Sequence, residues 1–234
     1  MRLRKLKTQN LKLKTSAPRP AKDLKAAARA FSDAEVERAR RSLMRRDPRL
    51  RALIKKHGAC GITKHRTRDP FASLVGTITS QQLSTKAADT IYKRVVDLVG
   101  GRESLTPDAL LAADPKALRA AGLSNQKVAY VRDLAERVKT GALDLHALDA
   151  HADEDVIAAI TAVKGLGRWS AQMFLMFRLN RPDIWPIGDL GIVRGVQHLH
   201  GMKRRPSPKT MERLGEAWRP YRSIAAWYLW RISD

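Results

Sequence analysis

Residues 162–174 of the chain are AVKGLGRWSAQMF, and this stretch decides the fold. Gly165 and Gly167 flank a single leucine, so the backbone can turn sharply and approach another group with no side chain in the way. Apolar residues recur with helical spacing before the turn, from Asp153 to Thr161, and after it, from Arg168 to Asn180. We therefore expect a helix, a tight hairpin and a second helix.

The hairpin has the composition of a phosphate-binding turn. Backbone N–H groups at the start of the second helix can donate to an anion, and the helix dipole favours negative charge there. Lys164 and Arg168 add positive charge, which favours a phosphate over a carboxylate ligand. A Gly-x-Gly turn is also common as a simple chain reversal, so this motif alone does not decide between the two interpretations.

A second motif, WPIGDLG at residues 185–191, places Asp189 among apolar residues at the expected start of a helix from about Leu190 to Leu199. A carboxylate in this position can simply cap the helix. It can also face a pocket while the helix dipole favours its negative charge, and a cationic sugar needs a negative charge nearby. The two roles are compatible.

The C-terminal stretch EAWRPYRSIAAWYLW, residues 216–230, contains three of the five tryptophans. Tryptophans on a terminal helix usually belong to the core. Flat aromatic walls also stack against an extruded base, and a methylated, cationic purine strengthens that contact by cation–π attraction. A fourth motif is the polar stretch at residues 79–84, which separates two expected helices. A side chain from such a turn could fill the gap that an extruded base leaves.

Helical patterns account for most of the remaining chain, and no segment has the pattern of a strand. We expect an all-α protein of about ten helices, with residues 29–234 as the folded domain. Its further helices are expected over about Ser32–Leu43, Pro48–His57, 70–78, Thr85–Val99 and Ser124–Lys139, with short ones starting at Pro107 and Pro115 and a terminal helix rich in tryptophan.

The charge predicts a polyanionic partner, because 45 Lys and Arg against 23 Asp and Glu give a formal net charge of +22. Nucleic acid is the first candidate. A membrane surface is a weaker one, because the basic arm at residues 1–28 lacks the wide apolar face of an interfacial helix. We expect that arm to be disordered and to contact phosphates without reading sequence, or else to act as a solubilising tail.

Several classes of protein and site are excluded by composition. The chain has no apolar run of about 18 residues and no secretion signal, so we expect a cytoplasmic protein, nucleoid-associated if bacterial. Cys60 is the single cysteine, which excludes an intrachain disulfide, a four-thiolate zinc site and a four-cysteine iron–sulfur cluster. We interpret Cys60 as a loop thiol without a function.

Taken in order, the three motifs at 162–174, 185–191 and 216–230 resemble the helix-hairpin-helix superfamily of DNA glycosylases, in particular its 3-methyladenine DNA glycosylase II branch. The likeness covers about residues 45–234. It implies two helical lobes around a cleft and an enzyme that acts on double-stranded DNA. Such an enzyme flips alkylated bases such as 3-methyladenine and 7-methylguanine and hydrolyses their N-glycosidic bonds, which starts base excision repair. The oligomeric state stays open, with a monomer as the default because the sequence has no obvious heptad run.

The resemblance also implies roles for individual residues. It makes Asp189 the catalytic carboxylate and assigns the base pocket, the DNA-binding residues and an alkali-ion site. The pocket would comprise Trp169, Met173, Trp185 and Trp230. The DNA-binding residues would be Gln81, Gln82 and Leu83 as the wedge, with Lys164, Gly165, Leu166, Gly167 and Arg168 at the hairpin. A structural Na+ or K+ would bind the backbone carbonyls of Thr161, Val163 and Leu166, and no other cofactor is required.

One departure from the wider superfamily predicts the reaction type. Relatives that also cut the DNA backbone carry a lysine nucleophile on the helix after the hairpin, where this chain has Trp169. Without that amine no Schiff base forms, so we expect a monofunctional hydrolase without AP lyase activity.

Other functions stay open from the sequence. A non-catalytic helix-hairpin-helix protein would bind DNA in a salt-sensitive way and would be unaffected by Asp189→Asn, apart from a small charge effect. A mismatch or oxidised-base glycosylase of the same superfamily is disfavoured, because the cysteine set of the iron–sulfur branches is missing and Trp169 argues against the lyases. The preferred lesion stays open.

Overall fold

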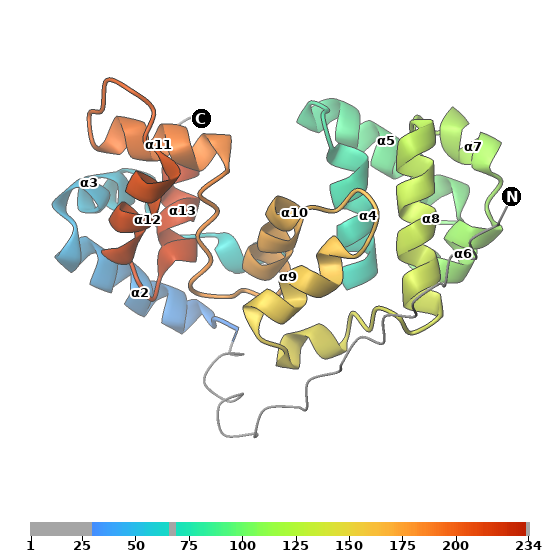
Figure 1. The fold of residues 1–234 in the computed structure, drawn as a ribbon, viewed down its shortest axis with the longest axis horizontal. Coiled ribbons are helices and arrows are strands. Elements are labelled where there is room, and N and C mark those ends of the chain that lie inside the picture. The colour runs from blue at the N-terminus through green and yellow to red at the C-terminus, as the bar shows by residue number, and fades with distance from the viewer. Residues whose placement is uncertain (1–29, 66–68, 233–234) are drawn as a thin grey trace, which may run out of the picture.

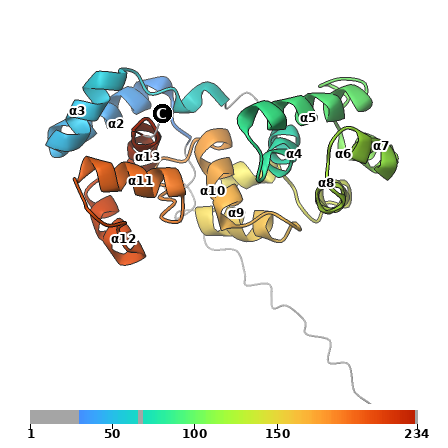
Figure 2. The same ribbon diagram turned by 90° about the horizontal axis from the view of Figure 1, so that it is seen from above.

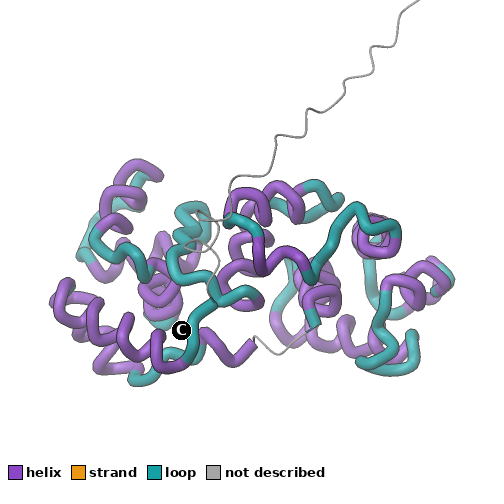
Figure 3. The backbone as a smooth tube through the Cα atoms, turned by 90° about the horizontal axis from the view of Figure 1, so that it is seen from below, coloured by secondary structure: helices purple, strands orange, loops and turns teal. Residues whose placement is uncertain are grey.

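The computed structural model describes residues 30–65 and 69–232, and the predicted basic arm at residues 1–28 lies outside them. The described residues form helices, turns and loops, with no strand (Figure 3). The α-helices are α2 (Asp33–Arg46), α3 (Pro48–His57), α4 (Pro70–Ser80), α5 (Thr85–Leu98), α6 (Pro107–Ala112), α7 (Pro115–Ala120), α8 (Asn125–Lys139), α9 (Asp153–Thr161), α10 (Arg168–Met173), α11 (Leu190–Leu199), α12 (Pro208–Glu216) and α13 (Arg222–Trp230).

Most helix starts follow from local sequence. Five helices begin with proline directly after a capping Asp, Ser or Thr whose side chain accepts a backbone N–H: α3, α4, α6, α7 and α12. Proline suits this position because the first helical N–H has no partner within the helix. Ser32 and Glu35 form a reciprocal capping box at α2. These short-range signals explain why the predicted starts agree with the structure.

The helices are grouped into two lobes (Figures 1 and 2). One lobe combines α2 and α3 with the C-terminal helices α11, α12 and α13. The other holds α4–α8, and α9, α10 and a following π-helical turn, η3 (Phe174–Arg178), lie between the two groups. The chain thus leaves the first lobe after α3 and returns to it at α11. The predicted all-α, two-lobed architecture is confirmed.

Two elements differ from the sequence prediction. The helix expected from Arg168 to Asn180 stops being α-helical at Met173, and η3 inserts one extra residue, with the Leu179 N–H donating to the Phe174 carbonyl at 3.0 Å. Helix α12 was not predicted, because it is short and has only Met211 and Gly215 buried. No described helix is long and apolar enough to cross a membrane.

Inside the first lobe, segments near the beginning and the end of the described chain form hydrogen bonds with each other. Trp218 is fully buried, and its indole N–H donates to Asp47 Oδ2 at 2.8 Å. Tyr228 donates to the Gly58 carbonyl at 2.6 Å. Both contacts connect segments that are about 170 residues apart in sequence, so they fix how the C-terminal helices pack on α2 and α3.

Cys60 lies partly buried against this lobe, and burial raises the pKa of its thiol to about 12. At pH 8 the fraction of Cys60 present as thiolate should therefore be on the order of a thousandfold lower in the native protein than in the unfolded chain. We expect the thiol reagent DTNB to react slowly in buffer and rapidly in guanidinium, measured by absorbance. Rapid stoichiometric reaction in buffer would contradict the buried setting.

Candidate active site

Asp189 lies at the N-terminus of α11 and is almost fully buried, with 9% of its surface exposed. Its Oδ1 atom accepts the backbone N–H of Ile192 at 2.8 Å, so the side chain caps the helix. The capping role expected from the sequence is confirmed.

Two indoles complete the environment of this carboxylate. The Trp169 N–H, from α10, donates to Asp189 Oδ2 at 2.7 Å, and the Trp230 N–H, from the end of α13, donates to Oδ1 at 2.8 Å. Gly191 makes room for Trp230, because a Cβ there would lie 2.7 Å from the indole Cδ1 atom. Three helices that are distant in sequence therefore converge on one buried acceptor.

A cavity of about 860 Å³, lined by aromatic, apolar and charged side chains, lies next to this cluster. Trp169 is 47% exposed, and Phe177 stacks on Trp230 with ring centroids 5.6 Å apart. Met173 and Phe177 line the cavity on one side, and Ser73 and Thr77 of α4 are among the residues that line the rest. Asp189, Trp169 and Trp230 are not in the lining, so the cavity meets the carboxylate cluster only through Phe177, which stacks on Trp230.

Of the four predicted pocket residues, Met173 lines the cavity, Trp169 and Trp230 instead bind the carboxylate, and Trp185 lies elsewhere. Trp185 is buried in the first lobe, where its N–H donates to the Met211 carbonyl at 2.9 Å and its ring packs edge-on against Trp218 at 5.3 Å. We therefore correct its assignment from pocket to core. Phe177 was missed, because the helical periodicity gave no sign of the π-helical turn that carries it.

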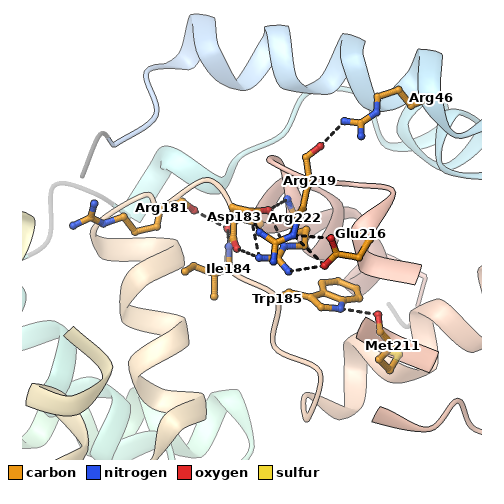
Figure 4. Close-up of polar contacts among 10 residues, drawn as sticks. Arg46, Arg181, Asp183, Ile184, Trp185, Met211, Glu216, Arg219 and Arg222 are labelled. Atoms are coloured by element: carbon orange, nitrogen blue, oxygen red, sulfur yellow. Dashed lines mark hydrogen bonds and ion pairs between the residues drawn. The ribbon is translucent and has the colours of Figure 1, made fainter. Parts of the chain in front are cut away.

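The loop that carries Asp189 is anchored at its start by a charged network (Figure 4). Asp183 accepts from Arg222 Nε and from Arg219 Nη1, both at 2.7 Å, and its carbonyl accepts from Arg222 Nη2 at 2.8 Å. Ser223 donates to the Arg181 carbonyl at 2.6 Å and accepts the Ile184 N–H at 3.0 Å. The loop is thus fixed to the start of α13, the helix that supplies Trp230.

The hairpin presents its backbone outward. Leu166 is buried, so its side chain is not available to a ligand, and only its main chain agrees with the predicted DNA-binding role. Lys164 is exposed. Arg168 forms an ion pair with Glu154 at 2.6 Å, so any contact it makes with a phosphate has to compete with that carboxylate.

The predicted wedge lies next to the hairpin. The Gln81 side chain donates to the Gly165 carbonyl at 2.7 Å, which places the turn at residues 81–83 beside the Gly-x-Gly segment. Gln82 has a positive φ of 58°, and Leu83 is an exposed apolar side chain. The structure therefore brings together the two DNA-binding segments that the resemblance implied.

The carbonyls predicted to hold an alkali ion are compatible with that role. Among the backbone hydrogen bonds that the described residues form outside the helices, none is accepted by the carbonyls of Thr161 and Leu166. The Val163 carbonyl accepts one, from the Leu166 N–H at 3.1 Å. Carbonyl oxygens with free lone pairs are suitable ligands for Na+ or K+.

Comparison with known proteins shows the family to which the chain is similar. Residues 75–220 match the profile described as "HhH-GPD superfamily base excision DNA repair protein". "DNA-3-methyladenine glycosylase 1" of Schizosaccharomyces pombe is 33% identical over 71% of this chain and 73% of its own length. A DNA-3-methyladenine glycosidase structure from Bacillus halodurans has a TM-score of 0.75 and 39% identity, covering 84% of this chain and 89% of that one. A structure of the S. pombe 3-methyladenine DNA glycosylase with abasic DNA has a TM-score of 0.74 and 31% identity, covering 84% and 96%.

The two hairpin glycines should differ in their tolerance of a side chain. Gly165 has a φ of +79°, and a Cβ there would overlap the Tyr130 ring, whereas a Cβ at Gly167 would meet nothing within 4 Å. We expect Gly165→Ala to lower the free energy of unfolding by about 1–3 kcal/mol. The matched Gly167→Ala should cost less than about 1 kcal/mol in urea unfolding. Equal losses would contradict the packing of Tyr130 on Gly165.

Proposed function

Because the chain belongs to the HhH-GPD superfamily of base excision DNA repair proteins, we propose that it is a DNA glycosylase that flips alkylated bases out of duplex DNA and hydrolyses their N-glycosidic bonds. The observation that carries this proposal is the Asp189 carboxylate, held by two indole N–H groups beside a cavity with an aromatic wall.

In the proposed mechanism the bond between C1′ of the deoxyribose and the base nitrogen breaks first. Its electron pair leaves with the base, which needs little protonation when alkylation has already made it cationic. The sugar becomes an oxocarbenium ion, and Asp189 stabilises that charge. Water then adds to C1′ and loses a proton, with the same carboxylate orienting it. The products are a free base and an abasic site.

The aromatic residues would select and hold the flipped base. The Trp169 and Trp230 N–H groups are engaged by Asp189, which fixes both rings by one edge and leaves their orientation settled before a base arrives. A cationic purine gains from contact with an electron-rich indole, and Trp169 is about half exposed. Damage also weakens stacking or pairing, so altered bases cost less to flip.

The partner is double-stranded DNA. The hairpin backbone and Lys164 would bind phosphates, while Leu83 would fill the gap left by the base. We propose a monomer that needs no organic cofactor. The carbonyls of Thr161, Val163 and Leu166 would hold a Na+ or K+ ion, which would add positive charge beside the bound phosphate.

Replacing Asp189 tests the catalytic role. Asparagine keeps an oxygen for the helix cap but removes the negative charge. We therefore expect Asp189→Asn to reduce the rate of methylated-purine release by roughly 100-fold or more. Binding of alkylated duplex DNA should stay within about threefold. Asp97→Asn, at an exposed position on α5, is the charge-matched control and should keep full activity.

The outcomes of this experiment separate the candidate functions. Release of free bases by the wild type and the control, but not by Asp189→Asn, supports the proposal. Tight binding without any release, by wild type as well, would favour the non-catalytic DNA-binding protein. Retained release by Asp189→Asn would show that another group stabilises the sugar cation.

We also propose that the reaction stops at the abasic site. Trp169 has no amine with which to form a Schiff base, so treatment with borohydride during turnover should trap no covalent protein–DNA complex. Strand breaks should appear only after alkali, scored on denaturing gels. A trapped complex, or nicks without alkali, would show lyase activity and would require an amine elsewhere in the chain.

A further inference from the structure

Helix α8 lies beside α4 (Figure 1), and its side chains form hydrogen bonds with both proposed DNA-binding turns. Lys127, Tyr130 and Asp133 follow one another at intervals of three residues, which places them in a row along one side of the helix. None of these residues belongs to the Asp189 cluster, and the proposed chemistry does not use them. Their contacts therefore call for a separate explanation.

Lys127 binds the turn that carries the wedge. Its ammonium group donates to the carbonyls of Thr79 and Gln81, both at 2.7 Å. Carbonyls at a helix C-terminus have no partner within the helix, and here the lysine supplies one at the end of α4. Lys127 is partly buried, and this burial lowers the pKa of its ammonium group.

Tyr130 and Asp133 bind the hairpin. The Tyr130 ring packs where a side chain at position 165 would stand. Asp133 Oδ2 accepts the Lys164 backbone N–H at 2.9 Å and the Arg137 Nε at 2.9 Å. Burial raises the pKa of Asp133, but the Lys164 and Arg137 hydrogen bonds outweigh that effect and bring it below its ordinary value of 3.8.

A further hydrogen bond, from Gln81 to the Gly165 carbonyl at 2.7 Å, joins the two turns directly. The contacts form a closed ring: α8 binds the wedge turn through Lys127, α8 binds the hairpin through Tyr130 and Asp133, and the turns bind each other. The distance between the wedge and the phosphate-binding backbone is therefore fixed before DNA is bound.

We propose that Lys127 is a positioning residue for base extrusion: it holds the turn at residues 81–83 so that Leu83 enters the duplex at a set distance from the phosphate bound by the hairpin. This inference rests on the proposed glycosylase function. Because Lys127 contacts the wedge turn and not the Asp189 cluster, its loss should slow extrusion of a base that is stacked and paired, and should leave the hydrolysis of an easily extruded base unchanged.

The test compares Lys127→Met with the wild type on two duplexes under single-turnover conditions. One carries 7-methylguanine opposite cytosine, and the other carries it opposite a tetrahydrofuran abasic analogue, where no pairing has to be broken. We expect a loss of ~10-fold or more on the paired lesion and little change on the unpaired one. Fluorescence of 2-aminopurine next to the lesion should show slower extrusion in the variant, independently of hydrolysis.

The control variants separate positioning from charge and folding. Lys93→Met removes the same charge from an exposed position on α5 and should behave as the wild type, and Lys127→Arg should restore part of the rate. If Lys127→Met fails to fold by circular dichroism, the milder Lys127→Gln takes its place in the same comparison.

Two results would overturn the proposal: equal slowing on both duplexes, which indicates a general structural defect, or no slowing on the paired one. Absence of base release by the wild type from both duplexes would instead count against the glycosylase function. In that case the 2-aminopurine signal still decides whether Lys127 affects extrusion.

Discussion

A buried carboxylate needs hydrogen-bond donors, and in this protein that requirement organises the site. Asp189 has little access to water, so its oxygens accept N–H groups from Ile192, Trp169 and Trp230. These donors belong to α11, α10 and α13. The three helices are brought together only when the first lobe packs against α10. The same contacts that satisfy the carboxylate also fix the orientation of the two indoles.

The supports of this cluster are found well away from it. Asp183, bound by Arg219 and Arg222, fixes the start of the loop that ends at Asp189, and Ser223 ties the same loop to α13. A loop held at one end by an ion-pair network and at the other by a helix cap has little freedom. We infer that the network contributes to preorganisation of the carboxylate, because it fixes the start of the loop that ends at Asp189.

In the proposed mechanism, separate parts of the molecule would distort the DNA and cleave the glycosidic bond. The turns braced by α8 would bind phosphates and hold the wedge, while the Asp189 cluster and its aromatic wall would receive the base. Helix α10 connects the two, since it begins at the hairpin and carries Trp169 and Met173. The hairpin and the carboxylate are therefore connected through one short helix.

Much of the architecture was determined by the sequence alone: the helix starts, the hairpin, the capping position of Asp189 and the basic charge. These depend on interactions within a few residues, on prolines behind capping side chains and on helical spacing. The family resemblance added the site residues. Which aromatic residues line the cavity was decided by the tertiary structure: Trp185 is a core residue, whereas Phe177, in the π-helical turn, is part of the lining. Lys127 likewise acquires its partners only through packing of α8 on α4. Such contacts join segments about 40 to 50 residues apart, and local patterns contain no information on which of them meet.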